Sequence, residues 1–244
     1  MTAGGNGEAR DAQVDRSLDA LAGAGGAAPP MSDALARQLE GMKPARPRAP
    51  GRQLGGIVAL SLLYAGGLVA AIGVRRDLAQ LPLGWVIGFA ALWLVSFASI
   101  TWLVVVPPRG HVMPRWRSAA TLAVTAAVLL IAGGLLVPRQ VPGVSTMYEP
   151  TMWSVLEHAG ACVAFGMTGV IVPIALAALA VRGSVPVGSR WAAAAIGAAG
   201  GALGGLVLHM HCPIAERFHV GLVHGGVVVL AALVAALLAG LSRK

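Results

Sequence analysis

Six long apolar blocks dominate the sequence, and each approaches or exceeds the roughly 20 residues that a helix needs to cross a hydrocarbon core. The blocks cover residues 54–74, 83–106, 119–137, 158–181, 191–208 and 220–241. The chain is 57% hydrophobic and only 11% charged, which is typical of a membrane protein. Backbone polar groups in a bilayer must be satisfied within the protein, and no barrel-like alternation is present. We therefore expect an all-α, polytopic membrane bundle of six transmembrane helices.

The basic residues of the short loops predict the orientation of the chain. With the N-terminus inside, fourteen Lys and Arg residues lie on the inner side and four on the outer side. The four outer residues are Arg75, Arg76, Arg139 and Arg217. This positive-inside bias predicts cytoplasmic N and C termini. No short apolar core with a cleavage site occurs in residues 1–53, so we expect no signal peptide.

The formal net charge of +8 is a feature that nucleic-acid-binding proteins share. However, the basic residues flank the apolar blocks and form no motif known to bind DNA or RNA. We therefore attribute the charge to membrane topology and expect the lipid bilayer, and no nucleic acid, as the direct partner.

Residues 1–53 form the first of two predicted domains, a cytoplasmic partner-binding segment that precedes the transmembrane domain of residues 54–244. Gly, Ala and Pro make it largely disordered, apart from two short helix candidates at 11–22 and 32–43. Each candidate carries one apolar stripe at i, i+4 and i+7. The first stripe is Val14, Leu18 and Leu21, and the second is Leu35, Leu39 and Met42, with Arg37 beside it. Helices this short are marginal in water, so either the periodicity is chance or the helices fold on a protein partner.

The membrane-spanning blocks predict close packing without transport chemistry. In the fifth block, Gly197, Gly201 and Gly205 repeat at four-residue spacing, which lets another helix lie tightly against that face. No Asp, Glu, Lys or Arg lies in the middle of any block, whereas ion-coupled transporters place ionisable groups there. This absence argues against a transporter.

Reactive side chains gather at the end of the blocks that we place outside. Cys162 lies 20 residues before Arg182, and Cys212 lies 22 residues after Arg190. At 1.5 Å per residue, both cysteines therefore stand about 30 Å from the inner loop between the fourth and fifth blocks. If these two helices pack as a hairpin, the sulfurs come within disulfide or metal-sharing distance. The candidate metal ligands are Cys162, Cys212, His158, His211 and His209.

The ordinary alternative for these residues is structural. Cysteine is a common small buried residue, and histidine near a membrane interface is often only a polar group that reaches water. The sequence contains no C-x-x-C motif, which makes a disulfide oxidoreductase a poorer interpretation.

The stretch LHMHCPIAERFHVGLVHGG at residues 208–226 contains a His-Cys-Pro motif between the last two blocks. Together with VRRDLAQLP after the first block, Cys162 at the head of the fourth and MSDALARQLEGM, it makes the sequence resemble the NrsF-like anti-sigma factors. The resemblance covers most of residues 31–244. This chain departs from the family pattern in its longer N-terminus, with the extra 11–22 helix, and in the many histidines of its outer loops. The first departure leaves open which helix binds the partner, and the second leaves open the signal.

The resemblance implies regulation and no enzymatic activity. It implies a bacterial inner-membrane protein whose cytoplasmic N-terminal segment sequesters an extracytoplasmic-function sigma factor, through the two stripes. The thiols of Cys162 and Cys212 would then sense a thiophilic metal or an oxidant. No resident cofactor is expected, because a thiophilic divalent metal would act only as the signal. Two other interpretations stay open: a membrane redox protein that binds haem or quinone, and a small transporter.

Overall fold

The computed structural model describes residues 49–106, 115–136, 152–181, 189–214 and 216–241. For residues 152–158 it describes the backbone but not the side chains. The chain divides into two units, Met1–Arg48 and Ala49–Lys244, and every described residue belongs to the second. Both predicted stripes, from Val14 to Met42, lie outside the described residues.

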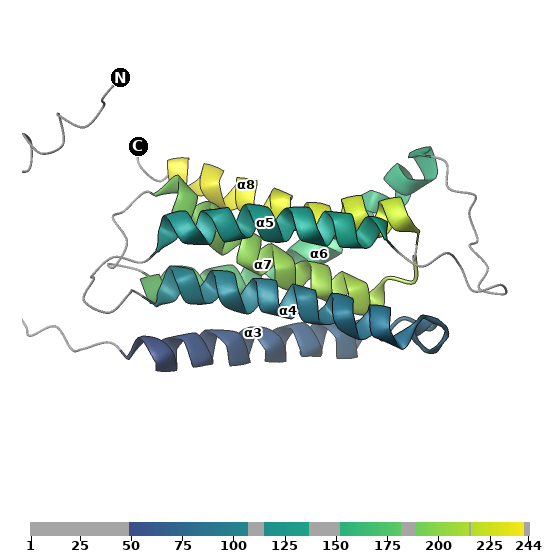
Figure 1. Ribbon diagram of the computed structural model, residues 1–244, viewed down its shortest axis with the longest axis horizontal. Helices are drawn as coiled ribbons and strands as arrows, with labels where there is room; N and C mark the ends of the chain where they lie inside the picture. Colours follow the sequence, from purple (N-terminus) through teal and green to yellow (C-terminus); the bar gives the residue numbers. More distant parts are fainter. Residues whose placement is uncertain (1–48, 107–114, 137–151, 182–188, 215, 242–244) are drawn as a thin grey trace, which may run out of the picture. The chain divides into compact units, whose positions relative to one another are not determined.

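All regular structure in the described residues is helical, which confirms the predicted all-α membrane fold (Figure 1). Six helical segments are long and apolar enough to cross a membrane. The helices that form them are α3 (Pro50–Ile72), α4 (Leu83–Val105), α5 (Trp116–Leu135), α6 (Met152–Val181), α7 (Arg190–His211) and α8 (Gly225–Leu241), and the fourth segment takes only Ala159–Val181 of α6.

Successive helices run in opposite directions, so the bundle has two distinct ends (Figure 1). The terminal end contains the start of α3 and the end of α8. The opposite end, called here the cysteine end, contains the connections formed by residues 73–82 and 212–218, including the short 3₁₀ turn η1 (Leu78–Gln80).

Helix α7 forms the centre of the bundle, since it contacts α3, α4, α5, α6 and α8. Of the most apolar stretch of α7, 78% is buried inside the bundle, whereas the corresponding figure for α3 is only 17%. The glycines of α7 have no side chain, which lets the neighbouring helices pack closely against it. A Cβ atom on Gly201 would lie 2.6 Å from the Cα atom of Val228 on α8, and one on Gly204 would collide with the carbonyl oxygen of Gly166 on α6. The predicted glycine face therefore holds helix backbones in direct contact.

The last membrane-spanning segment begins as a π-helix, η2 (His219–His224), and continues as α8. Backbone packing encloses this segment, because a Cβ atom on Gly134 of α5 would lie 2.6 Å from the Cα atom of Gly221. A π-turn accommodates one residue more than an α-turn and often occurs at functional sites. In this chain the π-helix begins at His219, which lies close to Cys162 and Cys212.

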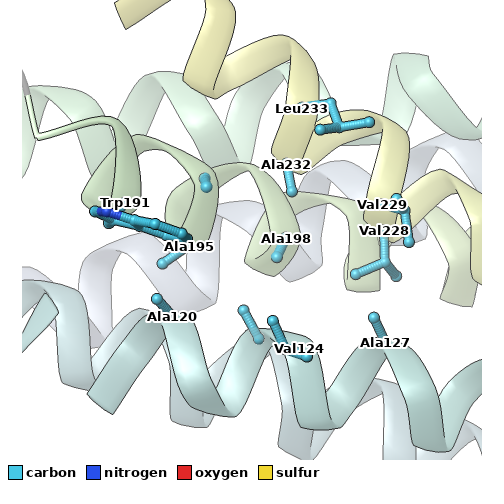
Figure 2. Close-up of a pocket in the computed structure, with 12 residues that line it drawn as sticks. Ala120, Val124, Ala127, Trp191, Ala195, Ala198, Val228, Val229, Ala232 and Leu233 are labelled. Carbon is cyan, nitrogen blue, oxygen red and sulfur yellow. The ribbon is translucent and has the colours of Figure 1, made fainter. Parts of the chain in front are cut away.

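Figure 2 shows a groove between α5, α7 and α8, with a volume of about 150 Å³. Alanine, valine and leucine line it together with Trp191, and no lining residue offers a carboxylate or an imidazole. The side chains of Trp191, Val124 and Leu233 are exposed, so in a bilayer lipid tails would cover the groove. It therefore offers neither an axial ligand for haem nor the polar groups that orient a substrate.

Candidate functional site

The two cysteines meet at the cysteine end of the bundle. Cys162 lies on α6, and Cys212 directly follows α7, where its backbone N–H donates to the carbonyl oxygen of Leu208. Their sulfur atoms are 3.9 Å apart. A disulfide has a sulfur separation of about 2.05 Å, so the structure holds two thiols in contact. Cys212 is buried and Cys162 is half-buried, which leaves access to the pair from the α6 side.

His219 joins the pair as a third donor. Its Nε2 atom lies 3.4 Å from the sulfur of Cys212, and the ligand atoms of Cys162, Cys212 and His219 all lie within 4.8 Å of one another. The predicted ligands do not include His219. The signal that could have found it is its position seven residues after Cys212, shortly after the His-Cys-Pro motif.

Glu216 fixes the start of the helix that carries His219. One carboxylate oxygen of Glu216 accepts from the N–H of Phe218 at 2.9 Å, and the other accepts from the N–H of His219 at 2.7 Å. These are backbone donors that a helix start leaves without helical partners, and a negative charge is favourable there. The side chain of Glu216 therefore sets where His219 begins its turn.

The structure holds two of the predicted histidine ligands elsewhere. His209 points toward α4, where its Nε2 atom lies 3.3 Å from the carbonyl oxygen of Val86. His211 places its Nδ1 atom 2.8 Å from the carbonyl oxygen of Gly73. His158 lies on α6 one turn before Cys162, and its side chain is outside the described residues. Of the five predicted ligands, the structure thus brings together Cys162 and Cys212.

Buried imidazoles extend the cluster away from the thiols. The rings of His219 and His224 are 5.2 Å apart in an edge-to-face arrangement, and both side chains are buried. Among the described residues, no hydrogen-bond partner faces either nitrogen of His224, or the Nδ1 atoms of His219 and His209. Burying a polar atom without a partner costs about 1–3 kcal/mol. A site that served packing alone would be better filled by apolar side chains, so this cost makes the cluster a candidate functional site.

Arg75 ties the first connection of the chain to the end of α7. It is buried, with its guanidinium paired to the carboxylate of Asp77 at 2.7 Å and directed at the carbonyl oxygens of His209 and Pro213. Its backbone N–H donates to the carbonyl oxygen of Met210 at 2.9 Å. The count of basic loop residues assumed that Arg75 is exposed. In the structure it is buried beside the cysteine and histidine cluster.

The surroundings of Cys212 keep its thiol protonated. The hydrogen bond with the thiol of Cys162 and burial both raise the pKa of Cys212 well above its usual range, against the opposing effects of a hydrogen bond with the backbone of Ile214 and of the charge of Arg75. A protonated thiol is a poor nucleophile, so a ligand that needs thiolates must displace protons.

Comparison with known proteins identifies one family. A family model described as "NrsF: Negative regulator of sigma F" matches residues 36–242. The matched region starts inside the second predicted stripe and includes both cysteines and His219. No curated protein and no solved structure matches the chain.

Proposed function

Because the chain belongs to the NrsF family of negative regulators of sigma F, we propose that it is a membrane anti-sigma factor that releases an extracytoplasmic-function sigma factor when a metal or an oxidant reaches Cys162 and Cys212. In this proposal the protein has no enzymatic activity and lies in the bacterial inner membrane. The N and C termini are cytoplasmic, in keeping with the positive-inside bias of the loops. The cysteine end then faces the outer compartment, where thiophilic metals and oxidants arrive first.

The N-terminal segment holds the sigma factor in this proposal. Its two apolar stripes would be covered by the partner, because short helices of this kind are stable only when bound. The family match begins at residue 36 and so includes Arg37, Leu39 and Met42 but none of the first stripe. We therefore assign the main contact to the second stripe.

The contact between the two sulfur atoms, 3.9 Å apart, is the observation that supports sensing. The thiols come from α6 and from the end of α7, so a covalent or metal bridge between them would constrain two helices at once. Moving the sigma-bound fraction from 99% to 1% requires a preference of about 5.5 kcal/mol for the releasing conformation. A metal ion supplies this preference to the extent that it binds the releasing conformation more tightly, and the roughly 10–16 kcal/mol of a structural zinc site leaves room for such a difference.

Helix α3 is the route that best connects the thiols with the N-terminal segment. Next to Cys212, His211 is bonded to Gly73 at the end of α3, and the backbone N–H of Arg75 is bonded to Met210. Midway along α3, the hydroxyl of Tyr64 donates to the carbonyl oxygen of Thr168 on α6 at 2.8 Å. Because α3 is the least buried span, a shift of α6 and α7 at the cysteine end moves it at little cost in packing.

A transcription experiment tests the proposal. Deleting the chain should raise transcription from promoters that depend on one sigma factor, and resupplying the full-length protein should lower it. Cd²⁺ or a thiol oxidant should then restore transcription. Cys162→Ser and Cys212→Ser should still repress but no longer respond. Unchanged transcription after deletion would contradict the anti-sigma role, and normal induction in both variants would contradict the thiol role.

A further inference from the structure

We propose that the sulfur atoms of Cys162 and Cys212 and the Nε2 atom of His219 form a binding site for one soft or borderline divalent metal ion. The inference rests on the proposed function, since it identifies the chemical class of the signal as a metal of the zinc and cadmium type. It also assigns His219 as the third ligand.

Two of the three distances between the donor atoms match the edges of a single metal site. Zinc bonds to thiolate at about 2.3 Å and to imidazole at about 2.05 Å. A tetrahedral ion therefore holds two sulfurs about 3.8 Å apart, and a sulfur about 3.6 Å from a nitrogen. The structure places the sulfurs 3.9 Å apart and the Nε2 atom 3.4 Å from the sulfur of Cys212. Both distances agree with the ideal values to within about 0.2 Å. The sulfur of Cys162 and the Nε2 atom of His219 lie within 4.8 Å of each other, so an ion closes this third edge with a shift of at most about 1.2 Å.

The donor types select the metal. Two thiolates and one imidazole suit zinc, cadmium and similar ions, whereas calcium and magnesium require oxygen ligands. Binding converts two thiols and one divalent ion into two metal–sulfur bonds and two released protons, with no change of oxidation state. The imidazole contributes a neutral nitrogen lone pair. Cys162 is half-buried, so a fourth ligand would reach a tetrahedral ion from its side.

The site joins three separate helical elements. Cys162 belongs to α6, Cys212 ends α7 and His219 begins η2. A disulfide would link only the first two, and the imidazole would then act only as a base on the thiol of Cys212. A metal ion would bond directly to the nitrogen of His219, so the effect of His219 on metal binding distinguishes a metal site from a redox pair.

Cadmium binding to the purified full-length protein tests the inference. Equilibrium dialysis with CdCl₂ should give one ion per chain, with the loss of two titratable thiols. His219→Gln keeps a polar side chain and should weaken binding at least about 10-fold, and either cysteine-to-serine variant should weaken it more. His209→Gln is the matched control, because His209 is equally buried at the same end but faces α4. It should bind within about 3-fold of the wild type.

The same variants separate this inference from the proposed function. If His219→Gln binds Cd²⁺ as tightly as the wild type, the third ligand is wrong, even where both cysteine variants abolish induction. If His219→Gln loses binding while a sigma-dependent reporter never responds to Cd²⁺ in the wild type, the metal site stands and its role as sensor fails. Loss of binding in His209→Gln to the same extent would show a general effect on folding and would overturn the assignment of His219.

Discussion

The Nδ1 atom of His211 donates a hydrogen bond of 2.8 Å to the backbone carbonyl oxygen of Gly73 and thereby joins the end of α7 to the end of α3. The direction of the bond is determined, since a carbonyl oxygen only accepts. Cys212 is the next residue in the chain, so any displacement of its sulfur acts directly on this bond.

Removing this link should separate sensing from release. In His211→Ala, the Cys162, Cys212 and His219 donors stay in place, so Cd²⁺ should bind within about 3-fold of the wild type. Induction of sigma-dependent transcription by Cd²⁺ should fall, because α3 no longer follows α7. Reporter activity over a range of Cd²⁺ concentrations measures this, and a wild-type response would rule out the route through this bond.

A charge in the second stripe should release the sigma factor. Burying a leucine contributes about 1.5–3 kcal/mol, so Leu39→Asp should weaken binding of the sigma factor by about 10- to 100-fold or more. Gln38→Asp introduces the same charge one residue away from the stripe and serves as the control. Co-purification with the full-length protein measures both. We expect a smaller effect from Leu18→Asp, and equal effects of Leu39→Asp and Gln38→Asp would contradict the stripe.

Binding of Cd²⁺ should release protons and should tighten as the pH rises. The hydrogen bond with Cys162 and burial raise the pKa of Cys212, so at neutral pH its thiol is protonated and the ion must displace that proton. Each proton that the ion displaces raises the apparent affinity by up to about 10-fold per pH unit. Calorimetry in two buffers of different ionisation enthalpy counts the protons. A heat of binding that is independent of the buffer would show that the thiols are already ionised.

Replacing His224 should stabilise the fold. Both ring nitrogens are buried without a hydrogen-bond partner among the described residues, and each such atom costs about 1–3 kcal/mol. His224→Leu has a similar volume and removes that cost, so the Tm should rise by several degrees. Thermal unfolding in detergent measures the change. A lower Tm would mean that the imidazole makes a stabilising contact that leucine cannot replace.

Adding a methyl group to the glycine face of α7 should destabilise the bundle. In Gly201→Ala the new Cβ lies 2.6 Å from the Cα of Val228, so α8 must move and stability should fall by about 1–3 kcal/mol. Gly226→Ala is the matched control, because no atom lies within 4 Å of its new Cβ. That variant should be neutral or more stable, since alanine favours helix by about 1 kcal/mol. Equal Tm values for the two variants would contradict the close contact.

The sequence predicted the spans well because bilayer thickness imposes helix length directly. The second predicted block, 83–106, differs by one residue from α4 (Leu83–Val105). Counting the rise per residue also predicted that Cys162 and Cys212 share one level of the bundle, and the structure places their sulfurs in contact.

The partners of the histidines could not be predicted in the same way. Successive helix positions differ by about 100°, so His211 lies beside Cys212 in sequence but faces another direction. His219 reaches the thiols only because the start of η2 lies against the end of α7, and a contact of this kind leaves no periodic signal. Burial of Arg75 likewise depends on carbonyl groups at the end of α7 that composition does not reveal.

The π-helical start of the last span also determines the rotational phase of everything after it. A π-turn holds one residue more than an α-turn, so the helix beyond His224 is rotated by about 100° relative to an uninterrupted α-helix from His219. Val228 and Ala231 contact Gly201 and Gly197 only in this phase. Deleting one residue from η2 would therefore turn the imidazole of His219 and the contact face of α8 out of register with each other.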